Sequence, residues 1–331
     1  MTVKIINADC RDAIRSLPDQ SVHCCVTSPP YFGLRDYGVD GQIGLEPTPD
    51  EFVAAMVEVF RDVKRVLRDD GTLWLNLGDS YVNAKGQPGG VDPKQPARRH
   101  GLRPQDVMLP GLKRKDLIGI PWRVAFALQA DGWYLRQDII WSKPNPMPES
   151  VQDRCTKAHE YIFMLSKSPR YYYDIDAIKE PAIAATSGEM DGGAQRNKDG
   201  SKANEGRNYR TDKQRGHSRR HAGFNERWDA MEKAEQCSGM RNKRSVWSVA
   251  TQPFSEAHFA TFPPSLVEPC IKAGCPRDGT VLDPFGGAGT TGLVADRLQR
   301  NAILIELNPD YAAMADRRLF NDAPLFAGDA A

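Results

Sequence analysis

The chain has 331 residues, a net charge of +1 and 40% hydrophobic residues, enough for one large α/β domain or two ordinary domains to bury a core. No apolar run is long enough to span a membrane, and Met1-Thr2-Val3-Lys4 does not begin a signal peptide, so we expect a cytoplasmic protein with no membrane partner. Seven cysteines without a C-x-x-C pair indicate neither a disulfide framework nor a zinc site, and we predict no metal.

The charge is unevenly distributed along the chain. Residues 94–115 hold seven Lys/Arg against one Asp, and residues 191–244 hold fourteen Lys/Arg against eight Asp/Glu, which leaves −11 on the remainder. Basic residues gathered in two loop-like windows are typical of a protein with a polyanion partner, although a solvated basic surface has the same composition.

The first predicted strand, residues 3–9, ends in Asp9, which either approaches a ligand or only caps the next helix. The second, residues 22–26, runs into Thr27-Ser28-Pro29-Pro30-Tyr31, where two consecutive prolines must stop the strand. The residues that follow therefore project from the carboxyl edge of the sheet, where α/β proteins bind ligands. A hydroxyl, rigid carbonyls and an aromatic ring suit a flat, amine-bearing molecule such as a nucleobase. The alternative is a plain strand end with Tyr31 packed in the core.

The next segment predicts a helix and a strand. Thr48, Pro49 and Glu51 have the form of a capping box, and apolar residues recur at three and four positions through Leu67. The strand at residues 72–77 then ends at Asp79 and Tyr81, which are second candidates for a site or simply part of a turn.

Residues 82–116 show no period and predict a lid or binding loop. A helix is expected over residues 117–130 and strands over residues 133–141, 159–166 and 171–174. Trp141 and Lys143, at the end of one of these strands, either line a ligand pocket or are a core aromatic and a surface charge.

From residue 182 to residue 244 the apolar period disappears, and Gly, Asn, Arg and Lys dominate. Such a composition rarely forms a core of its own and often orders on a partner. One helix is expected here, over residues 225–235, and ordered structure resumes at residues 245–248.

A second motif lies near the end of the chain, where residues 281–292 read as a strand, a glycine turn and a helix start. In such a βα unit the backbone can approach a nucleotide-like cofactor. Asp283 would repel a phosphate but can accept a hydrogen bond from an amino acid's ammonium group, and Glu306 ends the next strand where a ribose diol is usually held. An amino-acid end plus a ribose indicates S-adenosylmethionine.

With these motifs in this order, the sequence resembles the β-class DNA amino-methyltransferases, in which a Ser/Asp/Asn-Pro-Pro-Tyr/Phe motif precedes the cofactor loop. The resemblance covers nearly all of the chain except residues 181–245. It implies an α/β fold: a Rossmann-like methyltransferase sheet with helices on both faces, a circularly permuted motif order, and a basic insertion for target recognition. Residues 1–180 would form the catalytic half, 181–245 the target-recognition insertion and 246–331 the cofactor-binding half.

The resemblance also assigns residues to roles, with S-adenosylmethionine as cofactor and double-stranded DNA as partner. The catalytic residues would be Ser28, Pro29, Pro30 and Tyr31. The cofactor would be bound by Asp9, Thr261, Phe262, Pro263, Asp283, Pro284, Phe285, Gly286, Gly287, Gly289, Thr290, Thr291 and Glu306. DNA would be bound by Arg98, Arg99, Lys143, Arg207, Arg210, Arg215, Arg219 and Arg220.

The implied reaction is direct methyl transfer to the exocyclic amine of a base rotated out of the duplex. Ser28 and the Pro29 carbonyl would accept both amine hydrogens while Tyr31 stacks on the base. Ser28 favours cytosine N4 over adenine N6, which stays a close alternative. The sequence sets neither the oligomeric state nor a pairing with a nuclease, so a homodimer and a cognate restriction nuclease are open partners.

Three other functions compete with this hypothesis. Cytosine C5 methylation would need a nucleophile such as Cys270, but this residue precedes the cofactor loop and is expected on a packing helix. An RNA or protein amino-methyltransferase is opposed mainly by the basic insertion. A catalytically silent DNA-binding protein is opposed by the intact residues of both motifs.

Overall fold

The computed structural model describes residues 1–34, 36–83, 104–181, 240–252 and 262–322. The chain divides into two compact units, Met1–Ile178 with Arg244–Ala331, and Lys179–Lys243. In the second unit the described residues form the antiparallel strands β6 (Glu180–Pro181) and β7 (Met240–Arg241). An ion pair between Arg241 Nε and Glu180 Oε1, at 3.0 Å, links these two strands.

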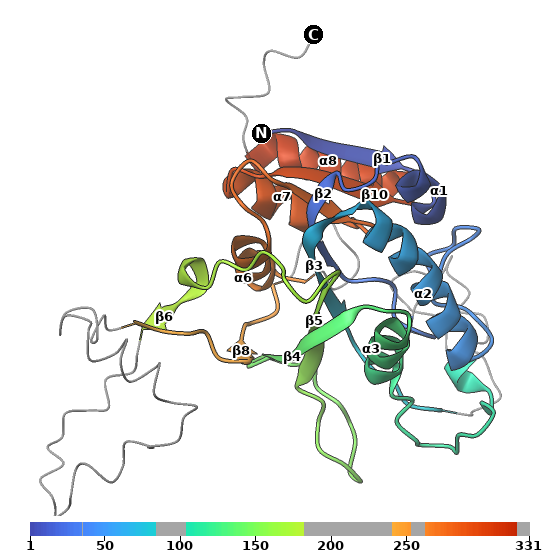
Figure 1. Cartoon of the computed structure of the whole chain (residues 1–331). Coiled ribbons are helices and arrows are strands. Elements are labelled where there is room, and N and C mark those ends of the chain that lie inside the picture. Colours follow the sequence, from blue (N-terminus) through green and yellow to red (C-terminus); the bar gives the residue numbers. More distant parts are fainter. Residues whose placement is uncertain (35, 84–103, 182–239, 253–261, 323–331) are drawn as a thin grey trace, which may run out of the picture. The chain divides into compact units, whose positions relative to one another are not determined.

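The first unit alternates strands and helices along most of its length (Figure 1). Its elements, in chain order, are β1 (Val3–Asn7), α1 (Cys10–Arg15), β2 (Val22–Thr27), α2 (Pro49–Val66), β3 (Leu67–Leu77), the short helix η1 (Pro104–Asp106), α3 (Ile120–Ala130), β4 (Tyr134–Ser142), β5 (His159–Ser166), the short helix η2 (Asp176–Ile178), β8 (Val246–Ser248), α6 (Pro264–Gly274), β9 (Thr280–Asp283), α7 (Thr290–Arg297), β10 (Asn301–Glu306) and α8 (Pro309–Asp322).

The eight strands of this unit form one sheet in the order β1-β10-β9-β2-β3-β5-β4-β8. Neighbouring strands are parallel except at β5, which runs antiparallel to both β3 and β4. The chain moves outward from the centre of the sheet in both directions, from β2 to β3 on one side and from β9 to β10 on the other. The predicted Rossmann-like sheet with helices on both faces is confirmed.

The central strands divide their apolar side chains between two cores. On β3, Leu73 and Leu75 join the core under α1, α2 and α3, whereas Trp74 joins the core under α6 and α7. On β2, Cys25 faces the first core, and Cys24 and Val26 face the second. Because successive side chains of a strand point to opposite faces, near-continuous apolar runs are what a sheet covered on both faces requires.

Helix α2 begins where the capping box predicts. The Thr48 side chain accepts a hydrogen bond from Glu51 N at 3.2 Å, and Glu51 Oε2 accepts one from Thr48 N at 3.1 Å. Two orphan amides of the first turn are thereby paired. The stripe from Phe52 to Val63 is buried, which fixes the face that α2 turns to the sheet.

The strand predicted over residues 171–174 is wrong. Tyr172 N donates to Asp70 O, and Asp174 N donates to Ala273 O, both at 2.9 Å, so the segment crosses between elements instead of joining a ladder. The Tyr173 ring stacks on Trp74 with centroids 6.4 Å apart. Its aromatic residues cover the sheet's face, a half-buried environment that favours the same residue types as a strand.

Two other predictions concern the helices expected from residue 117 and over residues 225–235. The helix expected from residue 117 begins at Ile120, because Leu117 bridges to Tyr81 and Gly119 takes a left-handed φ of +80° as N-cap. The helix expected over residues 225–235 lies outside the described residues. In the described part of the chain, no helix combines the length and apolarity that crossing a membrane requires.

Gly274, at the end of α6, allows this helix to approach the sheet closely. A Cβ at this position would lie 2.6 Å from Trp74 Nε1, 2.7 Å from Thr72 Oγ1 and 2.8 Å from Cys24 Sγ.

We expect Gly274→Ala to lower the free energy of unfolding by about 1–3 kcal/mol, the usual cost of overpacking a core. Denaturant titration measures it. Ser265→Ala, on the exposed side of the same helix, should stay within about 0.5 kcal/mol of the parent; equal stability of the two variants would contradict this packing argument.

Candidate active site

The carboxyl ends of β2 and β9 open into a cavity of about 850 Å³. These central strands are neighbours, and the chain leaves them in opposite directions across the sheet, a topological switch point where α/β sheets bind ligands. The volume suits a small-molecule site. The predicted site residues that line it are Asp9, Ser28, Pro29, Pro30, Tyr31, Lys143, Phe262, Pro284, Phe285, Gly286, Gly287, Thr290 and Glu306.

One wall of the cavity carries a connected set of polar side chains around Ser28. Asn76 Nδ2, on β3, lies 3.2 Å from Ser28 Oγ, 2.9 Å from the Tyr31 hydroxyl and 3.2 Å from Glu160 Oε2. The Tyr31 hydroxyl donates to Glu160 Oε2 at 2.6 Å. Burial, with the neighbouring Glu160 carboxylate, raises the pKa of Tyr31 well above its ordinary value, so the phenol stays protonated.

The Tyr31 ring is held against backbone. A Cβ at Gly78 would lie 2.4 Å from the ring's Cε2 atom, so only glycine permits this contact. The ring therefore packs on Gly78, directly after β3. It also borders the cavity.

Lys143 lies inside the cavity wall, with its side chain 17% exposed. Its ammonium pairs with Glu160 Oε1 and sits 4.2 Å from the centroid of the Trp141 ring. Trp141 is itself buried and lines the same cavity. The sequence left open whether these two residues line a pocket or are a core aromatic and a surface charge. The structure places both in the cavity lining.

The glycine turn after β9 is tied to the end of β10. Glu306 Oε2 accepts a hydrogen bond from Gly287 N at 2.8 Å, and Oε1 accepts one from Asn308 N at 2.8 Å. Burial raises the pKa of Glu306, and these two amide donors oppose the rise. The carboxylate borders the cavity and keeps lone pairs free for a diol.

Asp283 has a different setting from the one the sequence suggests. It is fully buried and is not among the residues that line the cavity. Its Oδ1 accepts from Thr27 Oγ1 at 2.6 Å and from Phe285 N at 3.1 Å, and its Oδ2 accepts from Thr291 Oγ1 at 2.6 Å. Burial raises the pKa of Asp283, and the two threonine hydroxyls counteract this. Its hydrogen bonds connect β9 to β2 and α7 behind the cavity.

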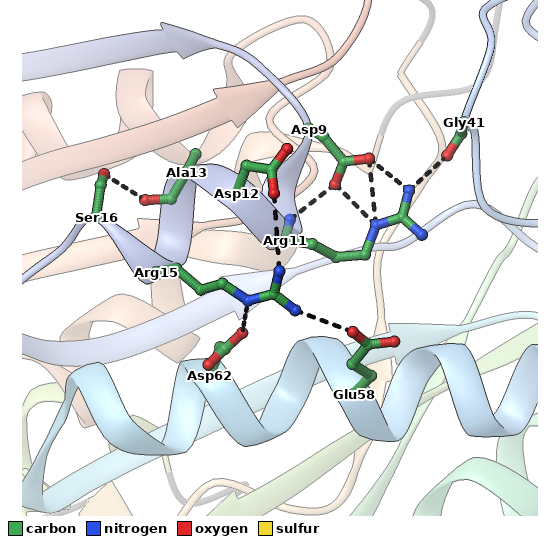
Figure 2. Close-up of polar contacts among 9 residues, drawn as sticks. All are labelled: Asp9, Arg11, Asp12, Ala13, Arg15, Ser16, Gly41, Glu58 and Asp62. Atoms are coloured by element: carbon green, nitrogen blue, oxygen red, sulfur yellow. Dashed lines mark hydrogen bonds and ion pairs between the residues drawn. The ribbon is translucent and has the colours of Figure 1, made fainter.

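Asp9 is the N-cap of α1 and also borders the cavity. Figure 2 shows the Arg11 guanidinium between the Asp9 carboxylate and the Gly41 carbonyl, which accepts from Nη2 at 3.0 Å. The hydrogen bond from Arg11 holds the pKa of Asp9 below its usual value, so Asp9 is an ionised acceptor at neutral pH. One turn further along α1, Arg15 reaches Glu58 and Asp62 of α2 (Figure 2).

The remaining predicted residues fall into two groups. Pro263, Gly289 and Thr291 are described but do not line the cavity: Pro263 is the N-cap of α6, and Gly289 has a left-handed φ of +76° where the turn enters α7. Asp79, a second candidate, both borders the cavity and caps the start of α3 by accepting from Gly119 N and Ile120 N. The predicted residues outside the described ranges are Thr261, Arg98, Arg99, Arg207, Arg210, Arg215, Arg219 and Arg220.

Sequence reasoning missed Asn76 and Glu160. Each is a polar residue in an otherwise apolar strand, and that irregularity was the available signal. Cys270, the nucleophile of the C5 alternative, is buried on α6 and does not line the large cavity.

These residues fit S-adenosylmethionine. Glu306 offers acceptors for a ribose, Asp9 offers an ionised acceptor for an amine, and Gly286 and Gly287 of the glycine turn border the cavity without side chains. When bound, the cofactor supplies an electrophilic methyl group. Ser28 and Pro29 face the same cavity and supply acceptors for an amine.

Comparisons with known proteins identify the family. A DNA methylase family model, of the N6/N4 methyltransferase type, matches residues 22–317. The Type II methyltransferase M.XycI of Xanthomonas campestris pv. cyanopsidis is 46% identical over 315 residues, 95% of this chain and 87% of the relative. The corresponding figures for M.SmaI of Serratia marcescens are 44% over 316 residues, 96% and 90%.

Among solved structures, the cytosine-N4-specific PvuII DNA methyltransferase has the same fold, with a TM-score of 0.60 at 17% identity, covering 98% of this chain and 92% of that one. A putative DNA modification methylase of Thermus thermophilus, complexed with S-adenosyl-L-methionine, gives 0.57 at 22% identity, covering 98% of both chains. The fold, the cavity and above all the family match over residues 22–317 lead to one conclusion: the chain belongs to the DNA methylase family of N6 and N4 methyltransferases.

Proposed function

We propose that the chain is a Type II DNA methyltransferase that moves the methyl group of S-adenosylmethionine to the N4 amine of a cytosine flipped out of double-stranded DNA. One observation carries the proposal. The Ser28-Pro29-Pro30-Tyr31 platform and the glycine turn beside Glu306 face one cavity, so an amine on the first and a cofactor on the second share one enclosed space.

The chain's own part in this reaction is to position the amine. The lone pair of an exocyclic nitrogen is delocalised into the ring, which makes it a poor nucleophile. Hydrogen bonds to Ser28 Oγ and the Pro29 carbonyl hold both hydrogens in a pyramidal arrangement and direct the restored lone pair toward the methyl donor. Orientation of this kind lowers the barrier without a base that must first deprotonate the amine.

The choice of cytosine follows from Ser28, because its Ser-Pro-Pro-Tyr motif resembles that of N4-cytosine enzymes. Lys143 supports a base in this position, since its ammonium borders the cavity and can donate to N3, the ring acceptor beside the amine of cytosine. Unpairing a base costs a few kcal/mol, which phosphate contacts from the basic windows of the sequence would offset.

The identity of the product tests the base. We expect DNA methylated by the purified protein to yield N4-methylcytosine when it is digested to nucleosides and examined by mass spectrometry. N6-methyladenine alone would keep the proposed chemistry and change the base. Detection of 5-methylcytosine would overturn the chemistry, because that product needs a cysteine nucleophile.

Replacement of the platform hydroxyl separates catalysis from cofactor binding. Ser28→Ala should lower turnover about 100-fold or more, as is usual when one hydrogen bond to the transition state is lost. Its dissociation constant for S-adenosylmethionine, measured by calorimetry, should stay within a few-fold of wild type. Ser21→Ala, whose hydroxyl donates to Pro18 O away from the cavity, is the control. A large loss of cofactor affinity in Ser28→Ala would assign this motif to the other ligand.

Glu306 should behave in the opposite way. Glu306→Gln retains the shape but loses one acceptor, so we expect cofactor affinity to fall about tenfold, or about 1.4 kcal/mol. Turnover at saturating cofactor should change little. The discriminating probe is a cofactor analogue without ribose hydroxyls: wild type should bind it more weakly than S-adenosylmethionine, and the variant should no longer tell the two apart. Undiminished discrimination in Glu306→Gln would remove the diol assignment. Glu58→Gln, on the surface of α2, is the matched control.

A further inference from the structure

The set of polar side chains around Ser28 has an acid at its far end, and this inference rests on the proposed amine methylation. Glu160 is the second residue of β5, the strand that runs antiparallel within the sheet. Because of that direction, its first residues lie at the carboxyl edge of β3 and border the cavity. The Glu160 side chain is 15% exposed.

The hydrogen-bond directions in this set follow from what each group can donate. A carboxylate only accepts, and the Glu160 carboxylate is paired with the ammonium of Lys143. The Tyr31 hydroxyl, at 2.6 Å, must therefore donate its single proton to Glu160. The Asn76 amide must likewise present its NH2 group, which lies 3.2 Å from Glu160 Oε2.

These directions continue to Ser28. With its proton committed, the Tyr31 oxygen can only accept; Asn76 Nδ2 lies 2.9 Å from it, and the Ser28 hydroxyl is a further polar neighbour. The hydrogen bond from Ser28 opposes the burial that raises the pKa of Tyr31, as a donated proton would. The two hydrogens of Asn76 Nδ2 are shared among three acceptors, of which Ser28 Oγ, at 3.2 Å, is the third. A serine oxygen has two lone pairs, so one remains for a substrate N–H.

We propose that Glu160 is a positioning residue, which acts through Tyr31 and Asn76 to orient the Ser28 hydroxyl as a hydrogen-bond acceptor for the amine of the target base. A serine free to rotate would also point its proton into the cavity. There it would face the two amine hydrogens, donor against donor, and the nitrogen lone pair would lose the geometry that methyl transfer requires.

The test places Glu160→Gln in two backgrounds. A glutamine keeps the size of the side chain but carries its own N–H donors, so it no longer compels Tyr31 to donate. In the wild-type background we expect kcat to fall 10- to 100-fold, while the KM for DNA and the dissociation constant for S-adenosylmethionine stay within about threefold. In the Ser28→Ala background the same substitution should change the residual kcat less than about twofold, because Glu160 has no hydroxyl left to orient.

Tyr31→Phe gives a second approach to the same link. It removes the hydroxyl between Glu160 and Ser28 and keeps the ring against Gly78. We expect Tyr31→Phe and Tyr31→Phe/Glu160→Gln to be about equally slow. Glu268→Gln, which removes an exposed acid paired with Lys272 on α6, controls for the loss of an ion pair and should keep the wild-type rate.

The outcomes separate the two proposals. If the wild-type protein gives no methylated DNA, the proposed function fails. If the wild type methylates DNA and Glu160→Gln is as fast, or if its effect multiplies fully with that of Ser28→Ala, Glu160 does not act through Ser28 and this inference is overturned.

Discussion

The site depends on one buried carboxylate at the junction of β2 and β9. Asp283 accepts a hydrogen bond from the hydroxyl of Thr27, at the end of β2, and another from the hydroxyl of Thr291, in the first turn of α7. Without it, the buried Thr27 hydroxyl would lose its acceptor, at about 1–3 kcal/mol, and Thr291 would keep only its longer contact to Val26 O, at 3.4 Å. The platform that begins at Ser28 and the glycine turn both leave from this junction. Their relative position is therefore fixed by the interior of the protein, before any ligand enters.

Three acids of the cavity wall, Glu160, Asp9 and Glu306, each have a cation or backbone amides as partners. Glu160 and Lys143 neutralise each other, Asp9 is neutralised by Arg11, and the half-buried Glu306 is held by two backbone amides. Each acid thus keeps its acceptor oxygens near the ligand without leaving an uncompensated charge in a low-dielectric space. A cationic cofactor and an amine that becomes cationic during transfer both favour such acceptors.

The sequence predicts the elements better than it predicts their partners. Thr48 and Glu51 locate the start of α2 because a capping box is local, and Pro29-Pro30 end β2 for a local reason as well. Glu160 could not be assigned, because its place beside Ser28 depends on the antiparallel register of β5, which no local pattern encodes. Asp283 reads as a ligand group for the same reason: its donor Thr27 is 256 residues away.

The permuted order also has a consequence for synthesis. Strand β1 pairs with β10, and the inner edge of β2 pairs with β9, so the first strands made wait for partners near the end of the chain. Until then Cys24 and Cys25, buried in the finished protein, lie on an open sheet edge. Such edges recruit other chains, which makes the interval between translation of β2 and of β9 the period when a nascent copy is most exposed to aggregation.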